Sequence, residues 1–297
     1  MLTSPDPAPE TPGRIVFLGR PCAFSRLAFE PLVAANLPIV GVIIPAAAGA
    51  GPEPRRVAAA GRSALPMAPT DLVGLAHALG IPVFAVRALR APASLALLAQ
   101  LRPTVLGAAC FPRRLPAEWL AAAPRGALNI HPSRLPAYRG PEPLFWQLRQ
   151  AEPHPGVTVH QMDADFDTGP ILAQHAIPWP AGASEAELER LTAAAGGRLL
   201  AELLTAGRFA AQPQPAADAS YYPRPTAVDL VIPTTWPARR AFNFMRGAAG
   251  WGPFVIEAPD GRRWPAAAAL ALTEAVQPPA AVGHWIPFSP GFLLVRP

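Results

Sequence analysis

Short apolar runs alternate with segments of helical periodicity through the first part of the chain. The apolar runs predict buried strands at residues 14–19, 37–45, 81–86, 104–110 and 126–133. Helices are expected between them at residues 25–35, 71–79 and 93–100, and Thr70 or Asp71 is expected to cap the second of these. A helix between two strands connects them in parallel, so we predict an α/β, Rossmann-like, mostly parallel sheet. Its ligand crevice is expected at the carboxyl ends of the strands.

A different pattern follows this alternating region. Residues 156–163 show β alternation, with Val157, Val159 and Gln161 on one face, and another strand is expected at residues 171–177 after a tight turn. Residues 184–206 have the strongest helical pattern, with Ser184 as the capping residue and Glu187 three positions later.

The composition of the chain divides it into segments. We expect a disordered leader at residues 1–13, a catalytic domain at 14–210, a linker at 211–227 and a small, β-rich C-terminal domain at 228–297. Within the small domain we expect a helix at 237–247 and strands around Phe254, Trp264 and Leu294. Residues 46–66, with Arg55, Arg56 and Arg62, are typical of a long loop.

Charge excludes some mechanisms and leaves others open. All 25 basic residues are arginine, so the chain lacks the lysine that a Schiff base or a P-loop requires. The net charge of +5 would suit a polyanionic partner, but the arginines are dispersed and form no long run.

The two cysteines, Cys22 and Cys110, lie far apart in the sequence, which argues against a zinc site and against a disulfide framework. No stretch of 18 residues lacks both proline and charge, and the N-terminus has no secretory pattern. We therefore expect a reduced, cytoplasmic protein that does not enter a membrane.

One polar cluster stands out in this apolar chain. Asn129, His131 and Ser133 alternate at a strand end, so their side chains share one face, and Asp167 follows on a DTGP turn. An amide and an imidazole can hold the oxyanion of a tetrahedral intermediate, and a carboxylate can relay a proton. These residues alone would also suit structural caps.

The sequence ALNIHPSRLPAYRGPEPLFW, followed by GVTVHQMDADFDTGPIL, resembles the signature pair of the 10-formyltetrahydrofolate-dependent formyltransferases. The resemblance extends from Arg14 to about Phe209 and implies the formyltransferase fold. It implies that Asn129, His131 and Asp167 are catalytic, and that the substrate loop contains Ser133, Pro136, Arg139 and Gly140. Arg134 departs from the family, which usually has leucine there.

The resemblance also implies a pocket for 10-formyltetrahydrofolate, the formyl donor. The residues at the matching positions are Phe111, Arg113, Leu115, Met162, Asp163 and Phe166. Arg113 and Arg114 could bind the carboxylates of the folate tail, whereas ordinary core packing remains an alternative for Phe111 and Leu115.

The acceptor implied by the resemblance is a primary amine. The loop at residues 19–25 lacks the phosphate-binding pattern of the glycinamide ribonucleotide branch. The first strand, the 46–66 loop and the two-domain layout resemble the methionyl-tRNA formyltransferase branch, which acts on initiator methionyl-tRNA. The GPEPLFW stretch is more similar to N-formyltransferases that act on amino sugar nucleotides or other small amines.

Two further alternatives stay open, namely hydrolysis of the formyl donor and a non-catalytic folate- or RNA-binding module. The second would usually have lost one of the three polar residues. The remaining histidines share no ligand spacing, so no metal is expected; they are His77, His154, His160, His175 and His284.

Overall fold

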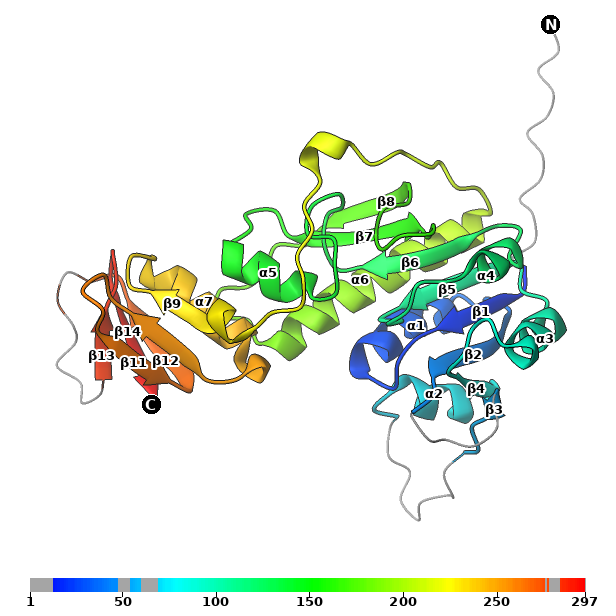
Figure 1. Cartoon of the computed structure of the whole chain (residues 1–297), viewed down its shortest axis with the longest axis horizontal. Coiled ribbons are helices and arrows are strands. Elements are labelled where there is room, and N and C mark those ends of the chain that lie inside the picture. The colour runs from blue at the N-terminus through cyan, green and yellow to red at the C-terminus, as the bar shows by residue number, and fades with distance from the viewer. Residues whose placement is uncertain (1–12, 48–53, 60–68, 276, 278–283, 297) are drawn as a thin grey trace, which may run out of the picture. The chain divides into compact units, whose positions relative to one another are not determined.

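The computed structural model describes residues 13–47, 54–59, 69–275, 277 and 284–296. The chain forms two compact units, and Figure 1 labels their elements. The first unit comprises Met1–Arg139, Gly156–Ala176 and Thr192–Ser220, and the second comprises Gly140–Pro155, Ile177–Leu191 and Tyr221–Pro297.

An eight-stranded sheet forms the centre of the first unit. Its strands are β1 (Ile15–Leu18), β2 (Ile39–Pro45), β3 (Arg55–Arg56), β4 (Val83–Val86), β5 (Val105–Ala109), β6 (Ala127–His131), β7 (Gly156–Gln161) and β8 (Ile171–Ala176). They lie in the order β3-β4-β2-β1-β5-β6-β7-β8. The central strands β4, β2, β1, β5 and β6 run parallel to one another. β3 pairs antiparallel with β4 at one edge, and β7 and β8 pair antiparallel at the other. The predicted mostly parallel sheet is thereby confirmed.

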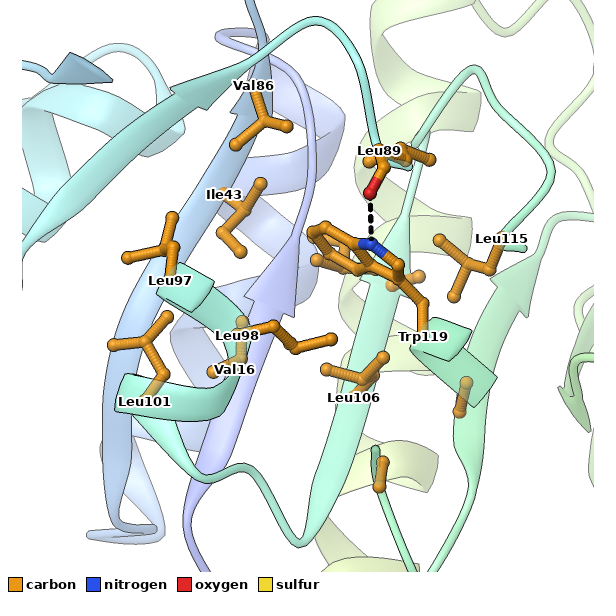
Figure 2. Packing of buried hydrophobic residues seen from close by; sticks show 14 residues of the cluster. Val16, Ile43, Val86, Leu89, Leu97, Leu98, Leu101, Leu106, Leu115 and Trp119 are labelled. Atoms are coloured by element: carbon orange, nitrogen blue, oxygen red, sulfur yellow. Dashed lines mark hydrogen bonds between the residues drawn. The ribbon is translucent and has the colours of Figure 1, made fainter. Parts of the chain in front are cut away.

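One face of this sheet is covered by α3 (Pro92–Leu101) and α4 (Ala117–Ala121). Val16 and Leu18 of β1 are fully buried in a cluster with residues of these helices, shown in Figure 2. The indole Nε1–H of Trp119 donates to the Leu89 carbonyl at 2.8 Å, so the largest side chain of the cluster has its polar atom satisfied.

The opposite face packs against α1 (Ala23–Ala34) and α6 (Glu185–Ala206). The ring of Phe17 on β1 lies 5.0 Å from the ring of Phe29 on α1. Because both faces are covered, the central strands are apolar at successive positions.

Two glycines let α6 lie close to its neighbours. A Cβ on Gly196 would lie 2.3 Å from Cγ2 of Ile130, and one on Gly197 would lie 2.4 Å from the Ala28 carbonyl oxygen. Glycine is therefore required here for close packing, despite its low helix propensity.

Capping side chains set the start of two predicted helices. The Ser184 hydroxyl accepts the Glu187 N–H at 3.3 Å, as expected for the start of α6. Asp71, rather than Thr70, caps α2 (Leu72–Ala78) by accepting the Gly74 N–H at 2.8 Å.

The second unit combines helices with two small sheets. It contains α5 (Pro143–Gln150), α7 (Ala238–Gly247) and the first turns of α6. One sheet has the order β11-β10-β9 and the other β12-β14-β13. Their strands are β9 (Val231–Pro233), β10 (Phe254–Glu257), β11 (Arg263–Ala266), β12 (Ala268–Thr273), β13 (His284–Pro287) and β14 (Phe292–Arg296). The predicted β-rich character of this C-terminal part is confirmed.

Several short elements were not predicted. They are β3, α4, α5, β9, β12, β13 and the 3₁₀ turns Ala216–Asp218, Ala227–Leu230 and Ala249–Trp251. These segments are too short for a periodic pattern to be distinctive. The leader to residue 12 and most of the 46–66 loop, including Arg62, lie outside the described residues. Within the described ranges, no helix combines the length and apolarity needed to cross a bilayer.

The sheet order also brings the two cysteines together. β1 and β5 are neighbours, with Leu18 opposite Ala108, and Cys22 and Cys110 follow these two strands. The Cys22 side chain is hydrogen-bonded to that of Cys110. Although far apart in the sequence, the two cysteines are thus neighbours in the fold, because parallel strands bring distant segments to the same sheet edge.

Candidate active site

The site is built on the antiparallel pair formed by β6 and β7. Asn129 lies opposite His160 and His131 lies opposite Thr158. Directly opposed residues share a face of a sheet, so these four side chains project to the same side. His131 and His160 are 4% and 2% exposed, which makes this face a buried polar cluster.

The tautomer of His131 follows from its contacts. Its Nε2 lies 2.9 Å from the Tyr138 carbonyl oxygen, which can only accept, so Nε2 carries a proton. Nδ1 faces Oδ1 of Asp167 at 3.4 Å. In the neutral ring Nδ1 carries no proton, so a proton taken up between these two atoms can pass from one to the other.

Electrostatics limits the charge of this imidazole. Burial lowers the pKa of His131, while the charge of Asp167 and the Tyr138 carbonyl act in the opposite direction. The net effect disfavours a lasting imidazolium, so His131 can hold an extra proton only while Asp167 supports it.

His160 orients the amide of Asn129. The Nδ1 of His160 lies 3.0 Å from the Gln161 carbonyl oxygen and therefore carries the proton. Its Nε2 is then an acceptor, and it receives an N–H from Nδ2 of Asn129 at 3.1 Å. This hydrogen bond sets which end of the amide faces the site and leaves the second N–H of Asn129 for another acceptor.

Asp167 lies on the DTGP turn and is 8% exposed. Its φ is +59°, a left-handed conformation that aspartate tolerates better than most residues. Gln214 clamps the turn, since its Nε2 donates to the carbonyls of Asp167 at 2.8 Å and Gly169 at 2.7 Å. A Cβ on Gly169 would lie 1.9 Å from the Gln161 carbonyl oxygen, so only glycine allows the turn to lie so close to β7.

The four residues of the expected substrate loop lie in different surroundings. Ser133 is fully buried, and its hydroxyl donates to the Ala137 carbonyl at 2.7 Å, so it holds the loop together. Pro136 accepts the Ser220 N–H through its carbonyl at 3.2 Å. Arg139 donates to Oε1 of Gln214 from Nε at 3.0 Å and from Nη2 at 2.6 Å.

Gly140, the fourth residue of that loop, belongs to the second unit. Its φ is +116°, and a Cβ there would lie 2.1 Å from the Tyr222 carbonyl oxygen. Glycine is required at this position by the backbone.

The residues expected to bind folate fall into two groups. Leu115 is 3% exposed and belongs to the hydrophobic cluster of Figure 2, against which Phe111 and Met162 also pack. Asp163 accepts the Thr168 hydroxyl at 2.7 Å and thereby braces the loop before Asp167.

Phe166 and the arginines make up the second group, which lies at the surface. The Arg114 guanidinium lies 5.8 Å from the ring centre of Phe166 and 3.3 Å from Asp165. Phe166 is 46% exposed, an unusual position for a large aromatic side chain. Arg113 donates to the Arg87 carbonyl.

A cavity of about 640 Å³ lies beside these residues. It is lined by Ala88, Leu89, Arg90, Arg113, Arg114, Leu115, Pro116, Ala117, Leu120 and Ala164. Asn129, His131 and Asp167 do not line it, although Ala164 belongs to the same loop as Asp167. The polar cluster and the cavity therefore share a loop of the chain, but no residue of the cluster lines the cavity.

Two residues of the cluster were missed in the sequence. His160 was counted among the scattered histidines, and Gln214 was assigned to a linker. His160 could have been recognised from the alternation of residues 156–163, had the pairing with β6 been known. Gln214 gave no signal, because a glutamine among prolines is typical of a linker.

The arrangement has the parts of an acyl-transfer site. It presents an oriented amide N–H, an imidazole and a buried carboxylate on one face, in the absence of a serine or cysteine nucleophile in this network. Within the described ranges, no group of three or more histidine, cysteine, aspartate or glutamate side chains could hold a metal ion.

Comparison with known proteins agrees with this chemistry. Residues 37–204 match the model of the formyl transferase family, and the chain belongs to this family. It is a formyl-transferring enzyme.

Its relatives include methionyl-tRNA formyltransferases. The chain is 38% identical to the one from Roseiflexus sp. strain RS-1, over 81% of this chain and 71% of the relative. It is 36% identical to the one from Bordetella petrii, over 79% of this chain and 75% of the relative.

Solved structures share the fold at lower identity. WlaRD, a sugar 3N-formyltransferase studied with dTDP and 5-N-formyl-THF, has a TM-score of 0.61 at 16% identity, over 95% of this chain and 96% of that chain. HypX from Aquifex aeolicus, studied with tetrahydrofolic acid, has a TM-score of 0.60 at 16% identity, over 95% of this chain and 43% of that chain.

Proposed function

We propose that the enzyme takes its formyl group from 10-formyltetrahydrofolate and transfers it to the amino group of methionyl-tRNA. The observation that carries the proposal is the buried network in which His160 orients Asn129 and Nδ1 of His131 faces Asp167 at 3.4 Å. Such a network provides an oxyanion donor and a proton relay at one place, as a formyl transfer requires.

In the first step, the neutral primary amine attacks the formyl carbon of the donor. A nitrogen–carbon bond forms, and the π electron pair moves to the formyl oxygen. The second N–H of Asn129 would hold this oxyanion. This donor is pre-oriented by His160, so little reorganisation is needed. His131, fixed by the Tyr138 carbonyl, faces Asp167 through Nδ1 and would steady its carboxylate.

In the second step, the positively charged nitrogen of the intermediate loses a proton to Asp167. The electron pair on the oxygen then re-forms the C=O bond as the bond between the formyl carbon and N10 of the folate breaks, and N10 receives that proton. The products are the formylated amine and tetrahydrofolate. Asp167 suits this role because it is buried and its turn is clamped by Gln214.

We assign the donor to the cavity beside Arg113. Its wall offers the apolar side chains of Leu89, Leu115 and Leu120 to a pterin or benzoyl group. Arg113 and Arg114 would bind the carboxylates of the tail through charge-assisted hydrogen bonds. Solved structures of the same fold that were studied with folates support a folate as the donor.

The relatives named methionyl-tRNA formyltransferase support tRNA as the acceptor. In the second unit, several exposed arginines already pair with carboxylates: Arg224 with Glu142, Arg239 with Glu274, Arg262 with Asp260 and Arg263 with Glu257. Exposed pairs of this kind are weak, so a phosphate can replace the carboxylate. The exposed Arg55 and Arg56 of β3 provide two further charges.

A sugar nucleotide is the second candidate acceptor. Sugar N-formyltransferases match this fold along nearly their whole length, 96% for WlaRD, whereas the chain covers 71% of the Roseiflexus relative. In this case the second unit would complete the pocket of a small acceptor or mediate dimerisation.

A panel of acceptors tests the proposal. The enzyme is incubated with the folate donor and with initiator methionyl-tRNA, an amino sugar nucleotide or no amine, and each product is identified by its mass. We expect a 28 Da increase on the methionyl group only. A formylated sugar would establish the second candidate, and formate released without an amine would identify a hydrolase.

Two variants separate chemistry from tRNA binding. Asn129→Ala should lower kcat by about 10²- to 10³-fold, because it removes an oxyanion donor. The double variant Arg55→Glu and Arg56→Glu should weaken tRNA binding and flatten the slope of log affinity against log salt by roughly 0.7 to 0.9 per lost phosphate contact. An unchanged salt slope in the double variant would exclude β3 from the tRNA interface.

A further inference from the structure

The two cysteines meet at the centre of the sheet. After β1 the chain forms β2 and β4 on one side of β1, and β5 then pairs with the other side of β1. The carboxyl ends of β1 and β5 flank this reversal, the point where open α/β sheets bind ligands. Cys22 is the N-cap residue of α1, and Cys110 directly follows β5.

A serine holds the first cysteine against the end of β5. The Ser25 hydroxyl is fully buried and donates to the Ala109 carbonyl at 2.9 Å. The hydroxyl oxygen of Ser25 also lies 3.4 Å from Sγ of Cys22. Since Ala109 precedes Cys110, this bridge keeps the two cysteines close, and their side chains are hydrogen-bonded.

The surroundings make Cys22 a reactive group. The hydrogen bond from Cys110, followed by the contacts with the Ser25 side chain and backbone and by the charge of Arg20, lowers the pKa of Cys22 to about 5 against the opposing effect of burial. Cys22 is therefore a thiolate at neutral pH, and the thiolate is the form that peroxides oxidise. Cys22 is partly exposed and Cys110 is exposed, so small oxidants can reach both.

We propose that Cys22 and Cys110 form an oxidation site, where a hydroperoxide produces an intramolecular disulfide that reversibly slows formyl transfer. The Cys22 thiolate attacks one oxygen of hydrogen peroxide, breaks the O–O bond and becomes a sulfenic acid, while hydroxide leaves. The Cys110 sulfur then attacks the Cys22 sulfur, and the sulfenic oxygen leaves as water. Two thiols and one peroxide thus give one disulfide and two waters.

The effect on formyl transfer rests on the proposed function. Cys110 is followed by Phe111 and by Arg113, which lines the proposed donor cavity. A covalent bond to Cys22 would draw the end of β5 toward α1 and restrain this segment. The main effect is therefore expected on the KM for the folate donor, and a thiol reductant such as dithiothreitol should reverse it.

The test compares oxidised and reduced full-length enzyme. After treatment with hydrogen peroxide, we expect a loss of 2 Da, a peptide that links Cys22 to Cys110, and a monomer on a non-reducing gel. The donor KM should rise at least threefold and return after dithiothreitol. Only disulfide-linked dimers, only sulfinic acids, or a disulfide that leaves the donor KM unchanged would each overturn the proposal.

Two variants identify which sulfur reacts first. In Cys110→Ser, peroxide should leave a sulfenic acid on Cys22 that dimedone traps, whereas Cys22→Ser should resist the same peroxide dose. Both variants should keep their activity under peroxide, and equal trapping at Cys110 would overturn the assigned order. The disulfide is detected by mass without any folate, so its absence would contradict the oxidation site alone. Formyl transfer by the reduced enzyme tests the proposed function separately.

Discussion

The two units surround their polar side chains in different ways. In the first unit, Asn129, His131, His160 and Asp167 contact one another on one face of the sheet. In the second unit, the charged Arg240 lies over an aromatic ring, with its guanidinium 3.8 Å from the ring centre of Trp236. Polar groups that contact each other can exchange protons, whereas an arginine over a ring only contributes packing and charge.

The second cluster continues beyond this pair. Arg149 lies 5.3 Å from the ring centre of Trp236 and 5.7 Å from that of Phe244, while Arg240 donates to the Arg149 carbonyl at 2.5 Å. Burial lowers the pKa of both arginines, but arginine stays protonated in proteins. We infer that this cluster stabilises the second unit.

The largest effect should come from Asp167→Asn. Asparagine tolerates the left-handed backbone at this position and has nearly the same shape, so the fold should be retained. Loss of the proton acceptor should lower kcat by about 10²- to 10⁴-fold. Steady-state kinetics and circular dichroism measure the two properties. As a matched control, His175→Ala at an exposed position of β8 should leave kcat unchanged; a normal kcat in Asp167→Asn would refute the assigned role.

A smaller effect is expected from His160→Phe, which tests positioning. Phenylalanine has a ring of similar size but cannot accept the Asn129 N–H, so the amide loses its fixed orientation. We expect kcat to fall about tenfold, as a misplaced oxyanion donor still functions in part, with little change in the donor KM. His160→Gln, which retains an acceptor, should restore part of the loss. If the KM rose and kcat did not fall, His160 would act in binding instead.

Arg240→Ala should affect stability rather than catalysis. It removes a contact with the Trp236 ring and a hydrogen bond to the Arg149 carbonyl, which together contribute about 1 to 3 kcal/mol. Arg239→Ala is the matched control, because Arg239 forms an exposed pair with Glu274 that adds little to stability. Denaturant unfolding followed by tryptophan fluorescence measures both. A loss of kcat in Arg240→Ala as large as that in Asp167→Asn would contradict a purely stabilising role for this cluster of the second unit.

The smallest effect concerns stability in weak acid. Since burial lowers the pKa of His131, the unfolded chain binds a proton more readily than the folded one below pH 6.5. The contribution of this residue is therefore present above pH 6.5 and is lost as the pH falls, with a slope of at most about 1.4 kcal/mol per pH unit. His131→Gln should unfold with a shallower pH dependence between pH 5 and 6.5. Equal slopes in the variant and the original would show that His131 is not the group responsible.

Patterns along the chain were sufficient to predict much of the fold and part of the site. Continuous apolar runs reveal strands covered on both faces, and the Ser184 cap with its periodic helix reveals α6, because these signals are local. The positions of Asn129 and His131 on one face follow from the two-residue period of a strand. The structure places His131 3.4 Å from Asp167, and the catalytic roles of Asn129, His131 and Asp167, which the resemblance implies, stay a prediction.

Tertiary structure alone decided the partners of these residues. His160 faces Asn129 because of the register between β6 and β7, and Gln214 reaches the DTGP turn from a segment with linker composition. Cys22 meets Cys110 because the sheet places β1 beside β5. Strand order and register depend on contacts between segments far apart in sequence, whereas hydrophobic periodicity records only which face of each segment is buried.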